Sequence, residues 1–381
     1  MEVLYVFPEP IPLPRARGVQ VAHSVAALAR AGVGVVFAYV PAGPGDPFRH
    51  YGIARPDNIR LVPLARGLPR PFAALKVHSN RLFLWRLARW LHAARRTGRA
   101  PQLIFARHLK AAHGLLKTFP GMPLIYEAHE VFGDTAPAGK QGVTRGMESF
   151  VTRSATVVIA NSRATAERLR ALYGVASEIP VVPNGVTLPG ARSEKDWSQI
   201  GRAIVYAGSF FSWKGVQDLV TAAGELPGCR ITLIGGSPEQ IERLRPCVKP
   251  GGAEIVFLGH LSHEETLRQL GRACIAVLPN RAEPDSAFTC PIKLFEYMAA
   301  GCAVVATDLP SVREIIGAHD AAWAEPGNPS AIARAIHVLV KDADLARRMG
   351  ERLHAIAGRY TWDARAARLK EIISGAVNAR N

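Results

Sequence analysis

Short, continuously apolar runs recur along the first half of the chain, and stretches with helical spacing separate them. The runs occupy residues 3–7, 33–40, 103–105, 124–126 and 156–160. Strands that are apolar along their whole length are typical of a parallel sheet covered by helices on both faces. The first half is therefore predicted to be a doubly wound α/β domain.

The second half of the chain repeats this pattern. Its apolar runs occupy residues 203–207, 230–234, 254–258, 273–278 and 303–306. A polar stretch at residues 189–200 lies between the two series and is predicted to be a linker. An amphipathic pattern over residues 362–376 predicts a last helix that is long enough to cross back onto the first domain.

We therefore expect a two-domain α/β protein. Its parts would be an N-terminal Rossmann-like domain at residues 1–189, a C-terminal one at residues 190–361 and a returning helix at residues 362–381. Two such sheets facing each other would form a cleft walled by the carboxyl ends of their strands, where α/β proteins bind ligands.

The composition fits this architecture. A chain of 381 residues with 48% hydrophobic composition is long enough for two ordinary cores. No uncharged apolar run approaches the roughly 20 residues that span a bilayer, and Glu2 stands where a signal peptide would be basic. We therefore expect a cytoplasmic protein. The five cysteines form no C-x-x-C pair, so neither a disulfide framework nor a structural zinc site is predicted.

The net charge of +16 belongs almost entirely to the first half of the chain. No acidic residue occurs between Asp57 and Glu127, whereas thirteen lysines and arginines do, the first being Arg60 and the last Lys117. A field of one sign over such a region attracts an anionic partner. The aromatic residues form no recognised stacking motif and no helix-turn-helix or zinc pattern is present, so a nucleic acid is not the expected partner.

One helical pattern within this basic region has two interpretations. Its apolar positions are Leu84, Leu87, Ala88, Leu91 and Ala94, with Arg86, Arg89 and Arg96 on the opposite side and Trp85 and Trp90 on the flanks. In the first interpretation it is an ordinary domain helix that buries its apolar stripe. In the second, the basic face meets anionic lipid or a phosphate-bearing acceptor, at the inner face of the plasma membrane.

The run PIKLFEYMAAG, residues 291–301, carries the most specific chemistry. Pro291 suits a first helical position and Gly301 a left-handed cap, so the helix is short and sharply bounded. The amides at its start would offer free N–H groups and a positive dipole to a diphosphate. Glu296 could accept both hydroxyls of a ribose, or it could pair with Lys293 one turn earlier.

This run resembles the donor-site signature of the retaining, GT-B fold glycosyltransferases of family 4, in which the second Glu of an E-x7-E motif holds the nucleotide ribose. Glu296 matches that second Glu, whereas Phe288 stands in the place of the first, whose carboxylate usually contacts the sugar. The resemblance implies a donor-binding C-terminal domain and an acceptor-binding N-terminal domain. The donor contacts that it implies along this run are Thr289, Cys290, Pro291, Ile292, Lys293 and Glu296.

The resemblance extends to the loop after the first strand of the second series. Gly208 and Lys214 match a glycine and a lysine that approach the diphosphate, and Ser209 replaces the usual arginine. Lys214 would then stabilise the leaving phosphate. A lysine at a helix start is, on its own, more often a solvated side chain. Further along, Gly235 matches a pocket wall and Leu258 lies where the nucleotide base usually packs.

Two residues of the first domain complete the resemblance. Gly18 matches the glycine that lets the backbone approach the donor phosphate, although capping alone explains a glycine at a helix start. His129 matches the family histidine near the transferred sugar and the reaction centre, although a lone His at a strand end is more often an ordinary polar loop residue.

The resemblance implies transfer from a UDP- or GDP-linked sugar with retention and without a metal, since no D-x-D motif occurs in a matching context. The acceptor would be lipid-linked, a polysaccharide or a small molecule, and the setting would be the synthesis of cell-envelope polysaccharide. Two alternatives stay open. One is a sugar-nucleotide 2-epimerase of the same architecture. The other is a non-catalytic nucleotide-sugar-binding subunit, because Phe288 and Ser209 replace charged motif residues.

Overall fold

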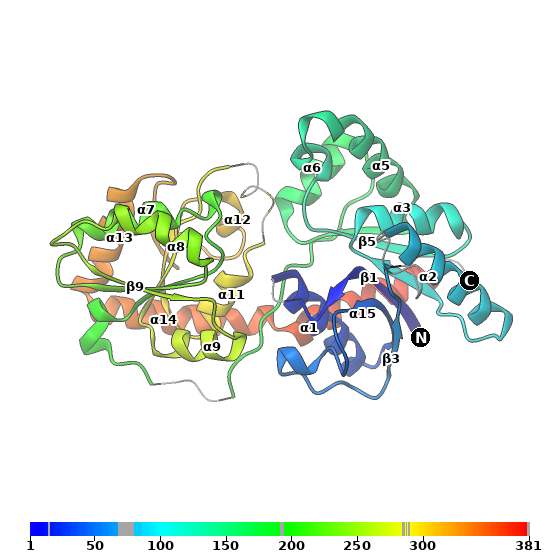
Figure 1. Cartoon of the computed structure of the whole chain (residues 1–381), viewed down its shortest axis with the longest axis horizontal. Helices are drawn as coiled ribbons and strands as arrows, with labels where there is room; N and C mark the ends of the chain where they lie inside the picture. Colours follow the sequence, from blue (N-terminus) through cyan, green and yellow to red (C-terminus); the bar gives the residue numbers. More distant parts are fainter. Residues whose placement is uncertain are drawn as a thin grey trace. The chain divides into compact units, whose positions relative to one another are not determined.

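The computed structural model describes residues 1–13, 16–67, 80–190, 194–283, 286, 288 and 290–378. The chain divides into two compact units, Met1–Gly185 together with Trp362–Asn381, and Val186–Thr361. We call them unit 1 and unit 2. Each contains a parallel sheet with flanking helices (Figure 1), so the prediction of two doubly wound α/β sheets is confirmed.

Unit 1 has a six-stranded parallel sheet within its described residues, in the order β3-β2-β1-β4-β5-β6. The strands are β1 (Glu2–Ile11), β2 (Gly34–Pro41), β3 (Ile59–Pro63), β4 (Leu103–Ala106), β5 (Leu124–Ala128) and β6 (Val157–Ala160). The helices are α1 (Ala16–Arg30), α2 (Asn80–Arg96), α3 (Leu109–Thr118), α4 (Phe132–Thr135), α5 (Gln141–Ser154), α6 (Arg163–Tyr173) and α15 (Trp362–Asn378), with 3₁₀ turns at Arg49–Tyr51 and Ala138–Lys140.

Unit 2 repeats the arrangement, with the order β12-β11-β10-β7-β8-β9 among its described residues. The strands are β7 (Ile204–Ala207), β8 (Arg230–Ile234), β9 (Glu254–Gly259), β10 (Ile275–Leu278), β11 (Ala303–Thr307) and β12 (Ala322–Ala324). The helices are α7 (Val216–Ala222), α8 (Pro238–Leu244), α9 (His263–Arg272), α11 (Ile292–Ala299), α12 (Pro310–Arg313), α13 (Pro329–Lys341) and α14 (Ala343–Ala357). 3₁₀ turns span Trp197–Arg202, Ser212–Lys214, Ala223–Glu225, Arg245–Cys247 and Gly358–Tyr360.

The apolar pattern did not reveal the edge strands β3 and β12. In β3 only Ile59 and Val62 are buried, whereas Arg60 and Pro63 are exposed, and as an edge strand it is paired on one side only. The β12 strand is only three residues long and half-buried at two of them. Neither strand has the long apolar run that marks a central strand of a parallel sheet.

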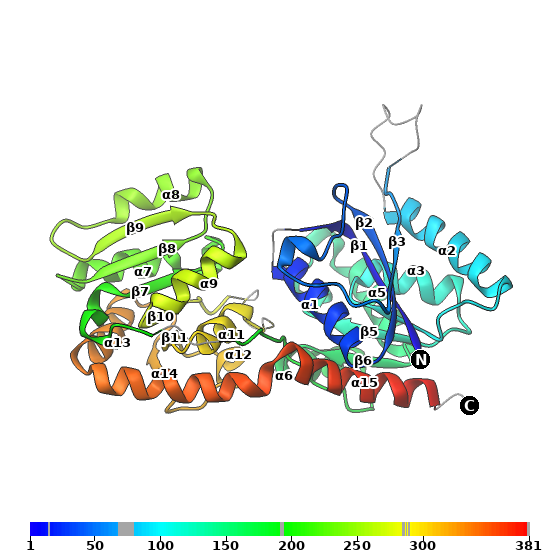
Figure 2. The same ribbon diagram turned by 90° about the horizontal axis from the view of Figure 1, so that it is seen from below.

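The last helix, α15, packs into the core of unit 1 and lies beside α1 (Figures 1 and 2). Its apolar side Trp362, Ala366, Leu369 and Ile373 is buried there. A side chain added at Gly185 would collide with the Trp362 indole, so a glycine is needed where the chain leaves unit 1. The two segments of unit 1 are thus held together by a shared core.

The stretch expected to be a linker is structured in its second part, so that expectation is wrong for residues 194–200. Lys195 is buried, and its Nζ donates to the carbonyl oxygens of Leu270 and Gly271 at 3.0 Å each and also to that of Ala273. A lysine at this position satisfies the last carbonyls of α9 and suits the negative end of its dipole. This segment therefore belongs to unit 2.

The basic helix is α2, and its apolar stripe faces the core of unit 1. Leu87, Leu91 and Ala94 are buried, as the first interpretation expects, together with Phe83, whereas Leu84 and Ala88 are half-buried. Arg86 was expected on the solvent side, but it donates to the backbone carbonyls of Ala65 and Gly67. Its role in this structure is to hold a neighbouring loop.

Candidate functional site

The loop that carries Lys214 is fixed by the segment that follows β10. The backbone N–H of Arg281 donates to the Trp213 carbonyl at 2.8 Å. The Arg281 guanidinium binds both carboxylate oxygens of the buried Asp218, at 2.6 and 2.7 Å. Gly215 has φ of +66°, and a side chain there would collide with the Pro279 carbonyl. The WKG sequence is thus a rigid turn whose shape requires the glycine.

Lys214 itself is half-buried, with its Nζ 3.8 Å from the centroid of the Trp213 ring. Burial, and next the positive charge of Lys293, lower the pKa of Lys214 to about 7. No carboxylate in the described part of unit 2 forms an ion pair with Lys214 that would offset these two effects. An anion bound between the two lysines would favour the charged form of both.

Helix α11 presents a buried carboxylate beside this cation pair. Glu296 is 4% exposed, and its Oε2 accepts a hydrogen bond from Lys293 Nζ at 2.6 Å. The other oxygen lies 3.9 Å from His263 Nδ1. The predicted ion pair between Glu296 and Lys293 is therefore formed, and it holds the Glu296 carboxylate next to the two lysines. The contact between Glu296 and a ribose stays a prediction.

The helix begins one residue later than expected. Pro291 has ψ of 101°, which is extended backbone, and it occupies the N-cap, with Ile292 as the first helical residue. Because proline has no N–H, the amides available at this helix start come from Ile292 and Lys293. Gly301 has φ of +67°, which confirms the left-handed cap.

The remaining residues predicted along this run are only partly described. Thr289 lies outside the described residues. Phe288 is half-buried, whereas Cys290 and Pro291 are buried. Their contacts with a donor stay predictions.

Gly208, Ser209, Gly235 and Leu258 lie together at or near the carboxyl ends of the adjacent strands β7, β8 and β9. The Gly208 N–H donates to the Ile234 carbonyl at 2.9 Å. Gly235 has φ of +118°, and a side chain there would collide with the Gly208 carbonyl. Gly235 is therefore required by the close approach of two backbone segments, whereas a side chain at Gly208 would meet the Tyr206 side chain. Leu258 is 37% exposed, so its side chain is available to a ligand.

In unit 1, Gly18 has a structural explanation of its own. It is buried in the first turn of α1, and a side chain there would meet the Leu13 carbonyl and the Tyr51 hydroxyl. Tyr51 in turn donates to that carbonyl at 3.0 Å. Close packing of the preceding loop accounts for this glycine, and its approach to a phosphate stays a prediction.

His129 follows β5 and lies in a buried polar cluster. Its Nε2 is 3.2 Å from Oε1 of Glu127, a carboxylate that is 1% exposed. The same Oε1 accepts from Gln20 Nε2 at 3.3 Å and from the guanidinium of Arg365, which comes from α15. Arg107, directly after β4, donates to Gln20 Oε1. The structure thus brings together residues of α1, β5, α15 and the end of β4.

Burial and the positive charges of this cluster lower the pKa of His129, whereas the Glu127 carboxylate acts in the opposite direction. Burial, followed by the positive charge of Arg107, lowers the pKa of His129 to about 4. Arg365 and His129 hold the pKa of Glu127 well below its ordinary value, against the opposing effect of burial. At neutral pH the cluster therefore contains a carboxylate, two guanidinium groups and a neutral imidazole.

Sequence reasoning named His129 but missed Glu127, Arg107, Gln20 and Arg365. One signal was available, because Glu127 is a charged residue inside the apolar run of β5, where a buried charge needs a partner. The partner Arg365 lies 238 positions further along the chain. No local pattern connects the two.

Comparisons with known proteins agree with this fold. The family model "Glycosyltransferase Family 4" matches residues 18–188, and the model "Glycosyl transferases group 1" matches residues 201–342. A glycogen synthase from Mycobacterium tuberculosis is 26% identical over 373 residues, covering 91% of this chain and 86% of that protein. A D-inositol 3-phosphate glycosyltransferase from Nocardia farcinica is 28% identical over 292 residues, covering 67% of this chain and 62% of that protein.

Two solved structures resemble the chain over almost its whole length. Sucrose-phosphate synthase from Thermosynechococcus elongatus has a TM-score of 0.76 at 20% identity and covers 99% of both chains. HepE from Anabaena, solved in complex with UDP-glucose, has a TM-score of 0.72 at 18% identity and covers 98% of this chain and 100% of that one. At such low sequence identity these similarities show that the chain shares the fold of these proteins.

The two Rossmann-like units and the two family matches define a glycosyltransferase of the hexosyltransferase type. The chain belongs to glycosyltransferase family 4, group 1, with the GT-B fold of its structural neighbours. Across the described residues, no helix has the length and apolar character that crossing a membrane requires. No group of three or more His, Cys, Asp or Glu side chains suited to a metal ion occurs in the same residues.

Proposed function

We propose that the enzyme transfers a hexosyl group from a nucleoside diphosphate sugar held by unit 2 to an acceptor held by unit 1, with retention of the anomeric configuration. The observation that carries this proposal is the pair Lys214 and Lys293 beside the buried Glu296. The two lysines suit a diphosphate, since no described carboxylate neutralises Lys214. The Glu296 carboxylate next to them suits ribose hydroxyls. This arrangement supports donor binding, and the two family matches support transfer over a non-catalytic binding subunit.

The nucleotide is inferred by analogy and from the residues of unit 2. The related HepE has been solved with UDP and with UDP-glucose. We therefore take a UDP-linked hexose as the first donor to test and a GDP-linked hexose as the second. The exposed Leu258, near the end of β9, is proposed to pack against the base.

In the proposed reaction the bond between the anomeric carbon and the diphosphate oxygen breaks. A bond from the acceptor oxygen to the same face of that carbon forms, and the acceptor proton passes to the departing phosphate. The ammonium of Lys214 and the first amides of α11 stabilise the charge on the leaving group. His129 lies near the transferred sugar in this proposal, and the reaction needs no metal.

Thermal unfolding with a panel of UDP- and GDP-linked sugars tests the donor. A ligand that binds only the folded chain stabilises it by about 2.7 kcal/mol at a concentration of one hundred times its Kd. We expect one donor to raise the unfolding temperature. In an activity assay that donor should be consumed only when an acceptor is present, and EDTA should not change the rate. Release of nucleotide without acceptor, together with conversion of the sugar at C2, would instead identify an epimerase.

A cavity in unit 1 is proposed to receive part of the acceptor. It has a volume of about 320 Å³ and lies where β1 and β2 end, between Ile11, Tyr39 and the loop at residues 43–50. Arg49 and His50 stand on its rim, while Asp46 is engaged by Arg55 at 2.7 Å. The unbalanced positive charge suits an acceptor that bears a phosphate or another anionic group.

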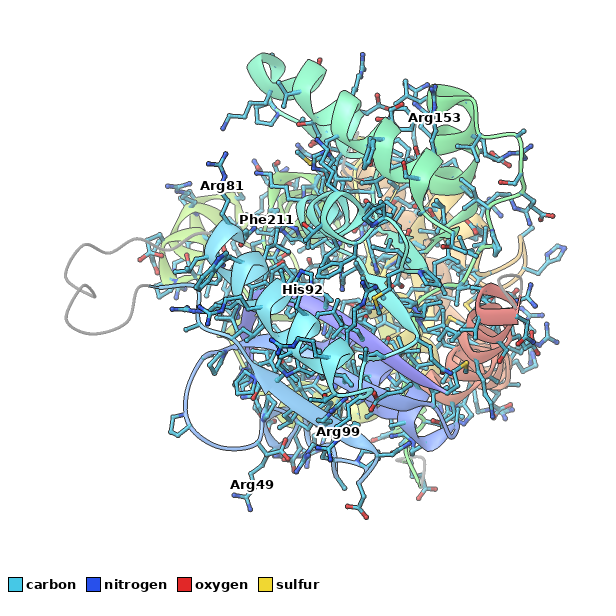
Figure 3. The ribbon with its side chains drawn as sticks, turned by 90° about the vertical axis from the view of Figure 1, so that its right-hand side faces the viewer. Arg49, Arg81, His92, Arg99, Arg153 and Phe211 are labelled. Atoms are coloured by element: carbon cyan, nitrogen blue, oxygen red, sulfur yellow. The ribbon has the colours of Figure 1, made fainter. Side chains whose placement is uncertain are left out.

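The exposed side of α2 is proposed to meet an anionic lipid surface. The residues exposed on it and just beyond its end are Arg81, Trp85, Arg89, Arg95, Arg96 and Arg99. Figure 3 views this side, with Arg81, His92 and Arg99 labelled. The guanidinium of Arg89 lies 4.7 Å from the Trp85 ring centroid, so charge and an aromatic surface are presented together.

Flotation with vesicles tests this surface. We expect binding to vesicles that contain phosphatidylserine but not to neutral ones, because each exposed basic residue contributes about 1 kcal/mol at an anionic surface. High salt screens this attraction, so binding should be lost there. The variant R89S/R96S should bind roughly 30-fold more weakly, since two such contributions amount to about 2 kcal/mol. R334S, which removes an exposed arginine of α13 in unit 2, is the matched control. Equal binding to neutral and anionic vesicles would contradict the proposal.

A further inference from the structure

The strongest unexplained feature of unit 1 is the ion pair between Glu127 and Arg365. Both side chains are nearly inaccessible, at 1% and 3% exposure. Two charges are buried here at a cost in desolvation, although an apolar pair of similar volume would fill the same space. The presence of such a pair raises the question of what it contributes that apolar packing does not.

The geometry around His129 suggests what that contribution is. On one side of the ring, Asn161 Nδ2 is 3.4 Å from Nδ1 and 3.3 Å from the His129 carbonyl oxygen. The amide of Asn161 is oriented by its Oδ1, which accepts from the Thr165 hydroxyl at 3.4 Å. An N–H therefore faces Nδ1, which favours the tautomer of the neutral ring that has its proton on Nε2.

On the other side of the ring, the Glu127 carboxylate supports the same tautomer. Its Oε1 is 3.2 Å from Nε2, although the two groups are not aligned as a hydrogen bond. A carboxylate so close attracts an N–H and repels a lone pair. The ring is thus held between an amide N–H at Nδ1 and an anion at Nε2.

The carboxylate alone would also favour protonation of the ring. Arg365 opposes this, because its guanidinium donates to the same Oε1 and offsets the negative charge. Arg107 adds a second positive charge on the side of β4. The other polar groups of the cluster, Gln20 of α1 and the Tyr5 hydroxyl of β1, are neutral, because the pKa of buried Tyr5 is raised far above the physiological range.

We propose that Glu127 and Arg365 are positioning residues that hold His129 as a neutral imidazole with its proton on Nε2. The inference rests on the proposed function only in taking His129 to lie at the reaction site. Protonation would place a second N–H at Nδ1 against the N–H of Asn161, so the ring or the amide would have to turn. The pair Glu127–Arg365 prevents this movement, and α15 thereby supplies a residue to the cluster around His129.

The test compares Arg365→Met with Arg368→Met by NMR of the histidine rings in the full chain. Arg368 lies on the same helix but is exposed and paired with Glu371, so its loss should change nothing. In Arg365→Met the unpaired Glu127 should raise the pKa of His129 by at least about one unit. The signal of His129 is assigned by its loss in His129→Asn.

Kinetics and a double variant complete the test. In Arg365→Met, the acid limb of kcat should move to higher pH together with the pKa of His129, while the KM for the donor stays unchanged. Glu127→Gln/Arg365→Met removes both charges and should return that limb towards its wild-type position. An Arg365→Met chain that is less stable but has an unaltered His129 titration would show a purely structural ion pair and overturn the proposal.

A second measurement covers the case in which Arg365→Met does not fold. Glu127→Gln keeps the shape of the side chain but removes the anion, so the ¹⁵N shifts of His129 should show a mixture of the two tautomers. A ring that stays fully protonated on Nε2 in this variant would also overturn the proposal. Both ring measurements need no donor, so they remain decisive if the proposed transfer reaction is wrong.

Discussion

Lys214 is the residue whose chemistry depends most on what binds next to it. Its pKa is lowered to about 7 by burial and by Lys293, so at pH 8 much of it is neutral in the free enzyme. A diphosphate stabilises the charged form, and binding above pH 7 therefore takes up a proton. Below pH 7 the proton is already present, so affinity for the nucleoside diphosphate sugar, whose phosphates do not titrate near neutral pH, should be constant there and fall as the pH rises above 7.

Calorimetry in buffers of different ionisation enthalpy measures this proton uptake directly. Affinity should fall by up to about tenfold per pH unit above 7. In Lys214→Arg the cation is permanent, so the pH dependence should disappear while binding survives. In Lys214→Ala, turnover should fall by roughly 10²–10³, as for the loss of one group that stabilises an oxyanion. Proton uptake that persists in Lys214→Arg would assign the titration to another group.

The same residue scale shows where sequence reasoning succeeds and where it stops. The pair Lys293–Glu296 follows from helical spacing, and the glycines at 208, 215 and 235 stand out at strand ends and turns. The Glu127–Arg365 pair and the buried Lys195 are different, because their partners are brought by the fold from distant parts of the chain. A sequence shows that a charge is present but not that its partner will be a buried carboxylate or a row of carbonyl groups.

At the scale of elements, the Lys214 loop is held by its contact with the residues after β10. The Arg281–Asp218 pair joins these residues to the first turn of α7. Arg281→Met would leave the buried Asp218 carboxylate without its bidentate partner and should destabilise the chain by about 1–3 kcal/mol. Because the loop would also become mobile, KM for the donor should rise, with kcat falling less.

Arg230→Met is the matched control, since Arg230 forms a similar bidentate ion pair with Glu254 on the surface of the same sheet. Exposed pairs contribute about 0–1 kcal/mol, so neither stability nor KM should change much. The double variant Asp218→Asn/Arg281→Met should recover part of the stability lost in Arg281→Met. If Arg281→Met and Arg230→Met behave alike, the loop is not fixed by this pair.

For the whole molecule, most of the architecture could be predicted from the sequence because central strands of parallel sheets are apolar along their length. The eight central strands and two of the edge strands, β6 and β9, were predicted in this way, whereas the edge strands β3 and β12 did not show the pattern. The family resemblance added the expected donor site, and the pairing of Lys293 with Glu296 agrees with its chemistry. The buried cluster of unit 1 had no such signal beyond the single charge at Glu127.

The last helix carries the final prediction, because it belongs to unit 1 although it follows unit 2 in the sequence. Ending the chain at Thr361 would remove Trp362, Ala366, Leu369 and Ile373 from the core and Arg365 from Glu127. Each large apolar side chain removed from a core costs about 2–5 kcal/mol, and the buried carboxylate adds its own penalty. That sum exceeds the roughly 5–15 kcal/mol of stability that a domain usually has, or comes close to it.

We therefore expect a chain that ends at Thr361 to lose the folded unit 1 while unit 2 keeps its own core. A chain that ends at Asn378 retains all of α15 and is the control. Hydrogen exchange measured by mass spectrometry should show β1, β2 and β5 unprotected in the shorter chain and β7, β8 and β10 still protected. If β1 and β5 stayed protected, α15 would be an accessory to unit 1, and its Arg365 would not be needed to hold the Glu127 cluster together.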